Sequence, residues 1–346
     1  MARISPISAI GLGGPRRWTI DGVVSGLTLL WGGPGVGKSF ISVSMGASVA
    51  TGRPWLGKRT NQGPVVYIAG EGGEEGVAHR VRAALAEWTV DAHDKQETVP
   101  FYIITPGIDL VENAFEFADL VGMPETLEER PRLVVVDTLS RCFVGDENKQ
   151  EFMGKFVKTL DAIRDRYGCD IIVIHHANKQ HELRGSSVLF GAVDVSWEIK
   201  NSPGRHAENE KKLFMTPDKL RERPSEGGRI NLRAKSRNLV TARGTHILDE
   251  FGDVQTTLVI KPTEEDLLKA KTVKACGLAV IEKKGCLSYQ DWRKLGPVAR
   301  WKKSDFDSAL SFIVTFPGKW GIMRGRKVGT YVKAKVDVVN EWGLSD

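Results

Sequence analysis

The sequence lacks the features that mark membrane, secreted and zinc-binding proteins. None of its 346 residues fall in an apolar run of about 18, the length needed for a transmembrane helix, so we expect no contact with a membrane. The first residues, MARISPISAIGLGGPRR, lack the long apolar stretch of a signal peptide. Four scattered cysteines, without a CxxC pair or a histidine at zinc-finger spacing, indicate reduced thiols in a cytoplasmic protein.

Excess charge is absent from most of the chain and is concentrated in one segment. Residues 264–346 contain 16 Lys and Arg and 10 Asp and Glu, so all of the formal net charge of +6 lies there. A basic module of this kind is suited to contact a polyanion such as nucleic acid. A solubilising surface is the alternative, and charge alone does not separate the two.

Short apolar runs alternate with helical patterns between residues 27 and about 200. Unbroken Val, Ile and Leu runs predict strands buried on both faces of a parallel sheet, and the alternation predicts an α/β domain with a mainly parallel, twisted sheet. From about 195 to 262 shorter strands follow, which we expect to extend the sheet by antiparallel or mixed pairing. The predicted strands of the first part are LTLLWG (27–32), VVYIAG (65–70), FYIIT (101–105), LVVVDT (133–138) and IIVIHH (171–176).

The last segment has a different pattern. Three helical stretches occur after residue 263, and the strand–turn–strand pattern KWGIMRGRKVGTYVKAK follows them. This order favours a small winged-helix-like domain that binds DNA or docks a protein. We therefore predict an N-terminal arm (1–20), an α/β core domain (21–262) and a basic winged-helix-like domain (263–346).

The run GGPGVGKS (32–39) matches the phosphate-binding P-loop, G-x-x-x-x-G-K-[ST], between a predicted strand and a predicted helix. Glycines let consecutive backbone N–H groups point at phosphate oxygens, and the helix N-terminus adds partial positive charge. Lys38 is expected to reach the β- and γ-phosphates, and the Ser39 hydroxyl to bind Mg²⁺. The predicted nucleotide-binding residues are Gly33, Pro34, Gly35, Val36, Gly37, Lys38, Ser39 and Phe40.

Two acidic residues complete the predicted site. Asp137 ends the apolar run RLVVVDT, where a Walker-B carboxylate would hold Mg²⁺ through water. Glu71 follows VVYIAG and is placed to deprotonate the attacking water, with Glu74 and Glu75 as competitors on the next turn. No guanine-reading motif of the N/TKxD type follows the later strands, which favours ATP over GTP.

Two adjacent histidines end the run DIIVIHHANKQ. With His181 nearby, a metal site is one interpretation. Successive side chains of a strand face opposite ways, however, so His175 and His176 cannot easily bind one ion. The sharper interpretation is that His176 senses the γ-phosphate while His175 packs in the interior.

The ordered set of motifs resembles the RecA-like ATPases, and within them the RepA-type hexameric helicases of plasmids and phages, close to the DnaB helicase family. The resemblance covers about 25–225 and is carried by LLWGGPGVGKSF, TGRPWLG, VVYIAGEGGEEGVAHRV, LVVVDTLSRCFVGDENKQEFMGKFV, IIVIHHANK, RGSSVLFGAVD and KLR. In contrast to DnaB, we expect neither an N-terminal helical domain nor a primase ahead of the core. Assembly would then rely on the core and on the arm.

The resemblance implies roles for particular residues. Glu71 matches the catalytic glutamate, and His176 matches the residue that reports loss of the γ-phosphate to the DNA-binding loops. Lys219 and Arg221 of DKLRERP match a K-x-R motif that reaches across a subunit boundary, with the arginine as a finger on the neighbour's ATP. The loops 141–150 and 177–190 match segments that point into a central channel, although the first of them is acidic.

DNA contacts are expected mainly from basic residues of the second loop and of the last domain. The predicted DNA-binding residues are Lys179, Arg184, Lys302, Arg324, Arg326 and Lys327.

These features predict an ATP- and Mg²⁺-dependent DNA motor that acts on single-stranded DNA. The leading form is a ring-forming replicative helicase, a homo-hexamer or another ring or filament, with a replication loader or initiator as a possible partner. One alternative is a RecA-like recombination or strand-annealing ATPase. The other is an ATP-switched DNA-binding regulator, against which the set Glu71, His176 and Arg221 argues, because a switch needs no fast hydrolysis.

Overall fold

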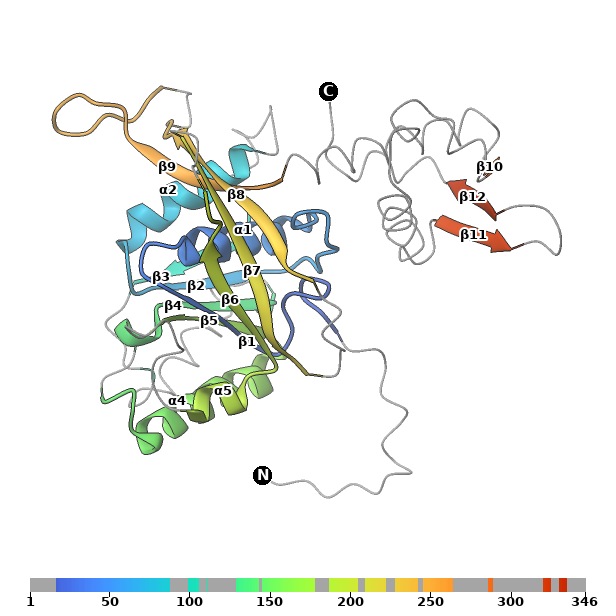
Figure 1. The fold of residues 1–346 in the computed structure, drawn as a ribbon. Coiled ribbons are helices and arrows are strands. Elements are labelled where there is room, and N and C mark those ends of the chain that lie inside the picture. Colours follow the sequence, from blue (N-terminus) through green and yellow to red (C-terminus); the bar gives the residue numbers. More distant parts are fainter. Residues whose placement is uncertain are drawn as a thin grey trace, which may run out of the picture. The chain divides into compact units, whose positions relative to one another are not determined.

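A nine-stranded sheet organises the chain between residues 27 and 262 of the computed structural model (Figure 1). The strands lie in the order β3-β2-β4-β5-β1-β6-β7-β8-β9. Their bounds are β1 (Leu27–Gly32), β2 (Val65–Ala69), β3 (Phe101–Ile104), β4 (Leu133–Asp137), β5 (Asp170–His176), β6 (Val195–Asn201), β7 (Glu210–Leu220), β8 (Ile230–Asn238) and β9 (Thr256–Pro262).

The structure describes most of the first 263 residues and three short strands beyond them. These residues are 17–87, 99–105, 110, 129–142, 145–177, 187–204, 209–221, 228–241, 245–263, 286–288, 320–324 and 330–334. The chain divides into two units, one formed by Met1–Ile230 with Ala234–Val259 and the other by Asn231–Arg233 with Ile260–Asp346.

The pairing of the strands confirms the prediction of an α/β fold with a mainly parallel sheet. Strands β3, β2, β4, β5, β1 and β6 pair in parallel, and β7 then pairs antiparallel with β6. The carboxyl ends of β1, β2, β4 and β5 therefore meet at one edge of the sheet, which is where α/β proteins bind their ligands.

Helices cover both faces of the sheet. Figure 1 shows α1 and α2 on one face and α4 and α5 on the other. Their bounds are α1 (Lys38–Thr51), α2 (Gly73–Ala86), α4 (Gln150–Tyr167) and α5 (Ser187–Ala192), with a short 3₁₀ helix, η3 (Leu139–Arg141), after β4.

The core beneath α4 follows from the spacing of its apolar residues. Phe156, Leu160 and Ile163 recur at helical intervals and are fully buried against alternate residues of β1 and β5, such as Leu27 and Ile171. Each such side chain contributes about 1.5–3 kcal/mol to folding. The other face of the same strands thus carries the residues that meet α1.

The second unit contains a three-stranded sheet in the order β10-β12-β11. Its strands are β10 (Cys286–Ser288), β11 (Trp320–Arg324) and β12 (Thr330–Ala334), and both pairings are antiparallel. The expected strand–turn–strand pattern coincides with β11 and β12. The three helices expected in 263–346 fall outside the described residues, so the winged-helix domain stays a prediction.

Within the described part of the chain, no helix combines the length and the apolar character that crossing a bilayer requires.

Candidate functional site

The P-loop connects β1 to α1 at the carboxyl edge of the sheet. Gly35 and Gly37 have φ angles of 66° and 102°, in the left-handed region that glycine adopts without strain. A Cβ added to Gly32 would lie 2.4 Å from the carbonyl oxygen of Ile199, so only glycine fits there. A Cβ on Gly33 or Gly35 would meet no atom within 4 Å, which leaves open space beside the loop where a phosphate would lie.

Lys38, the first residue of α1, is buried beneath this loop. Its Nζ donates to the carbonyl oxygens of Gly32 (2.9 Å) and Gly33 (2.8 Å) and lies 3.2 Å from Nδ1 of His176. Burial lowers the pKa of Lys38 to about 8, against the opposing effect of two nearby carboxylates. The ammonium group therefore has a partner for each of its three protons within the chain.

Asp137 and Ser39 lie together, as expected for a pair that holds Mg²⁺. Asp137 ends β4 with no exposed surface, and its Oδ1 accepts a hydrogen bond from Ser39 Oγ at 3.1 Å. Its Oδ2 accepts one from the hydroxyl of Tyr67 at 2.5 Å. Burial raises the pKa of the Asp137 carboxyl, and the bonds from Tyr67 and Ser39 oppose that rise.

The donor set at this edge fits a magnesium ion bound with a phosphate. The described residues contain no group of three or more His, Cys, Asp or Glu that could hold a metal by themselves. One hydroxyl and one carboxylate suit Mg²⁺, which keeps several waters and takes its other ligands from a nucleotide. Ser39 and Asp137 are the residues that would hold it.

Glu71 follows β2 and points toward the same edge. The backbone N–H groups of Gly70 and Glu71 both donate to the carbonyl oxygen of Asp137, at 2.6 and 3.1 Å, which ties this turn to β4. Oε1 of Glu71 accepts a hydrogen bond from Thr138 Oγ1 at 3.1 Å and lies 3.5 Å from Nε2 of His176. The competing residues Glu74 and Glu75 are exposed on the first turn of α2.

His176 links the P-loop lysine to Glu71. Because an ammonium group only donates, Nδ1 of His176 accepts from Lys38, and the ring proton of the neutral imidazole then lies on Nε2, facing Glu71. His175 alternates to the other face of β5, beside Trp31 of β1, and is 1% exposed. The two histidines therefore do not share a site.

Three residues of this edge were missed in the sequence. Tyr67 and Thr138 contact Asp137 and Glu71, and the guanidinium group of Arg80 lies 5.0 Å from the ring centre of Phe40. In the run VVYIA (65–69), side chains alternate between the two faces of the strand, so Tyr67 lies on the same face as Ala69 at the end of the strand. This alternation is the sequence signal that points to Tyr67.

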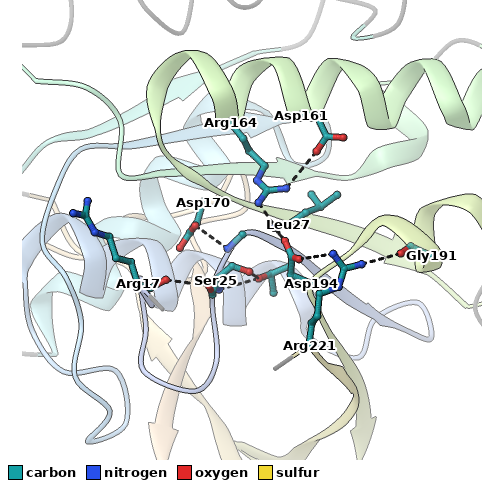
Figure 2. Close-up of polar contacts among 11 residues, drawn as sticks. Arg17, Ser25, Leu27, Asp161, Arg164, Asp170, Gly191, Asp194 and Arg221 are labelled. Carbon is teal, nitrogen blue, oxygen red and sulfur yellow. Dashed lines mark hydrogen bonds and ion pairs between the residues drawn. The ribbon is translucent and has the colours of Figure 1, made fainter. Parts of the chain in front are cut away.

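Lys219 and Arg221 lie at the opposite edge of the sheet. Nη1 of Arg221 forms an ion pair with Oδ1 of Asp194 at 3.1 Å, and Nη2 donates to the carbonyl oxygen of Gly191 (Figure 2). Nζ of Lys219 donates to the carbonyl oxygens of Phe190 (2.8 Å) and Gly191 (3.0 Å). This position follows from the antiparallel register, which sets the end of β7 beside the beginning of β6.

Asp194 joins this edge to the beginning of β1. Its Oδ2 accepts the backbone N–H of Leu27 at 3.0 Å and the guanidinium of Arg164 at 3.2 Å (Figure 2). The P-loop begins at the other end of β1, five residues and about 17 Å away at roughly 3.3 Å per residue. Arg221 and Lys219 are therefore remote from the P-loop of their own chain.

Most of the predicted DNA-binding residues fall outside the described part of the chain. Arg324 belongs to the described backbone of β11. The residues that lie outside the described ones are Lys179, Arg184, Lys302, Arg326 and Lys327.

Comparison with known proteins gives one family and a structural relative. Residues 10–182, half of the chain, match the family model described as AAA domain. The crystal structure of a KaiC-like protein from the hyperthermophilic archaeon Pyrococcus horikoshii OT3 is 15% identical in sequence, with a TM-score of 0.42. That similarity covers 70% of this chain and 94% of the other.

Proposed function

This chain belongs to the AAA domain family of P-loop ATPases, and we propose that it is an ATP-hydrolysing DNA motor, in the form of a ring-forming replicative helicase of phage or plasmid type. The observation that carries the proposal is the contact of His176 with both Lys38 and Glu71. A site that only binds nucleotide requires Lys38. A site that hydrolyses nucleotide and signals its loss requires Lys38, Glu71 and His176 together.

ATP and Mg²⁺ are the proposed ligands of the carboxyl edge. Backbone N–H groups of Gly33 and of residues 35–40, together with the ammonium of Lys38, would bind phosphate oxygens, and Ser39 and Asp137 would hold Mg²⁺. Bound Mg²⁺ supplies neutralisation of the charge on the β- and γ-phosphates. Asp137 is held in one orientation by its hydrogen bonds, so the chain presents the same oxygen to the ion at each turnover.

Glu71 is the proposed general base. Thr138 and His176 both contact its Oε1, which orients the carboxylate, and we assign Oε2 as the atom that receives the proton of the attacking water. The ammonium group of Lys38, which contacts His176, is also the group proposed to bind the phosphates. Arrival or loss of the γ-phosphate thus changes the partner of His176 and, through the strand that it ends, the loop 177–190.

The opposite edge is the proposed contact with the next subunit. Arg221 lies too far from its own P-loop to reach it, yet its side chain is 49% exposed at the surface. In a ring or filament, Arg221 and Lys219 would meet the ATP of a neighbouring copy, where an arginine stabilises charge that develops in the transition state. Assembly of copies is thereby a condition of hydrolysis.

Single-stranded DNA is the proposed track. Lys179 and Arg184 follow the strand that ends in His176, and we propose that they contact the DNA and respond to the nucleotide state that His176 senses. The antiparallel pairing of β11 with β12 supports the proposed wing. Arg324, Arg326, Lys327 and Lys302 are its proposed DNA contacts, and the last three lie outside the described residues. A loader or initiator protein is a further proposed partner.

The test is unwinding of a tailed duplex with ATP, run beside ATP turnover with and without single-stranded DNA. Unwinding together with DNA-stimulated turnover supports the motor. Strand exchange or annealing without unwinding would assign the chain to the recombination ATPases. ATP-dependent DNA binding without turnover would assign it to the regulators.

Deletion of residues 264–346 separates the proposed DNA contact of the last domain from protein docking. If the domain neutralises phosphates, the deletion lowers DNA affinity and reduces the slope of log affinity against log salt by about one unit for each phosphate that is no longer neutralised. An unchanged affinity and slope would favour docking of a protein.

A further inference from the structure

The hydroxyl of Tyr67 contacts Asp137 from a neighbouring strand, within the core. Strands β2 and β4 pair in parallel, with Tyr67 beside Val135 and Ala69 beside Asp137. Side chains two residues apart face the same side of a strand, so Tyr67 and Asp137 both face α1. A tyrosine is long enough to span this diagonal, and its hydroxyl meets the carboxylate at 2.5 Å.

The two oxygens of Asp137 have different partners. Oδ2 accepts from Tyr67, and Oδ1 accepts from Ser39 Oγ, the hydroxyl that would bind Mg²⁺. A carboxylate that rotates about its Cβ–Cγ bond exchanges its oxygens, and a strong bond to one of them opposes this rotation. The contact with Tyr67 therefore assigns Oδ1 to the side of the ion.

The phenol is itself held in place. Tyr67 has no exposed surface, and its ring stacks on Phe101 with centroids 5.9 Å apart. Its hydroxyl also lies 3.1 Å from Ser42 Oγ, which is 2.9 Å from the carbonyl oxygen of Ser39. Ser42 lies one turn beyond Ser39 on α1, so the same hydroxyl pair joins β2, β4 and the first turn of α1.

We propose that Tyr67 is a positioning residue for magnesium: its hydroxyl fixes Oδ2 of Asp137, so that Oδ1 and Ser39 face the ion together. This inference rests on the proposed binding of Mg²⁺ and ATP. Tyr67 itself touches neither the ion nor the nucleotide. Its contribution is confined to the metal, since the P-loop backbone and Lys38 bind phosphate without it.

The substitution Tyr67→Phe tests this role because it keeps the ring that stacks on Phe101 and removes only the hydroxyl. The measurement is the affinity for a fluorescent ATP analogue, in EDTA and over a titration of Mg²⁺. Loss of one hydrogen bond to a buried carboxylate predicts that the gain in affinity on adding Mg²⁺ falls about tenfold, and that half-saturation needs correspondingly more Mg²⁺. Affinity in EDTA stays as in the wild type.

Tyr102→Phe is the matched control, since it removes a tyrosine hydroxyl from the adjacent strand β3 of the same sheet. A Tyr67→Phe protein with the same response to Mg²⁺ as the control would overturn the inference. So would an equal loss of affinity in EDTA, which indicates a general structural role. A wild-type protein whose nucleotide affinity ignores Mg²⁺ would instead refute the proposed function on which the inference depends.

Ser42→Ala decides the question if Tyr67→Phe does not fold. It removes the second hydroxyl that aims the phenol, and a loss of about two- to threefold, seen only with Mg²⁺, supports the role of Tyr67. An unchanged response to Mg²⁺ in Ser42→Ala would overturn it.

Discussion

Each end of strand β1 carries a cluster of polar side chains, and the two clusters differ in how far they are exposed to solvent. At its carboxyl end, His176 lies 3.2 Å from Lys38 and 3.5 Å from Glu71, and the backbone N–H of Glu71 donates to the carbonyl oxygen of Asp137. At its amino end, Asp194 receives the N–H of Leu27 and two arginines. Lys38 is 5% exposed, whereas the Arg221 side chain is 49% exposed.

This difference in burial distinguishes the preorganised site around Lys38 from the exposed surface around Arg221, which a partner subunit could contact. In the ion pair of Arg221 with Asp194, only the arginine is well exposed, at 49% against 13%. Because Asp194 keeps Arg164 and the N–H of Leu27 as partners, we expect a small cost when Arg221 leaves it. Lys38, at the other end of β1, loses buried hydrogen bonds when it moves, so only a ligand that replaces these bonds can draw it away. The carboxyl end is thus suited to bind nucleotide and the amino end to meet a second copy of the chain.

The largest expected effect comes from the carboxyl end. Glu71→Gln keeps the shape and the contact with Thr138 but cannot take up a proton, so ATP turnover falls by about 10²–10⁴-fold while ATP binding remains. Steady-state kinetics measure the loss of ATP turnover, and a nucleotide-affinity measurement tests whether ATP binding remains. Glu74→Gln and Glu75→Gln are the matched controls, and a comparable loss in either of them would move the base to that residue.

A smaller effect is expected at His176, which ends β5 just before the proposed DNA-contacting loop 177–190. His176→Ala breaks the link between Lys38 and Glu71, so stimulation of turnover by single-stranded DNA falls about tenfold, while ATP affinity stays within about twofold. The exposed residue His246 offers a control, His246→Ala. If DNA still stimulates the His176 variant fully, signalling does not pass through this residue.

A third prediction concerns stability. Because the pKa of Lys38 is about 8 in the folded protein and 10.5 as a free side chain, the folded state binds fewer protons than the unfolded state between these values. The free energy of unfolding therefore rises with pH across this window, by about 3 kcal/mol in total. Lys38→Met removes this rise, as urea unfolding without nucleotide at pH 7–10.5 measures. The exposed Lys155→Met should keep it, and parallel curves for wild type and Lys38→Met would contradict the prediction.

The parts of the site that were predicted are those set by local sequence. The P-loop spacing and the apolar run that ends at Asp137 placed Ser39 and Asp137 at one edge, and the alternation of β5 placed His175 and His176 on opposite faces. The contacts of Tyr67 and Asp194 depend instead on which strands are neighbours and in what register. The order of strands in a sheet is decided by crossovers between distant segments, and no local pattern contains it.

The most direct test of the contrast between the two ends is to mix subunits that each lack one of them. Arg221→Ala retains the P-loop and Lys38→Ala retains the arginine, so each variant alone is inactive. Random mixing in a ring makes about a quarter of the interfaces complete, and turnover should return to about a quarter of the wild-type rate. Arg59→Ala is the control, since it removes an exposed arginine that is paired with Asp21. This variant should hydrolyse ATP without being mixed with a second variant. A mixture as inactive as its two components would contradict the assignment of Arg221 to a neighbouring active site.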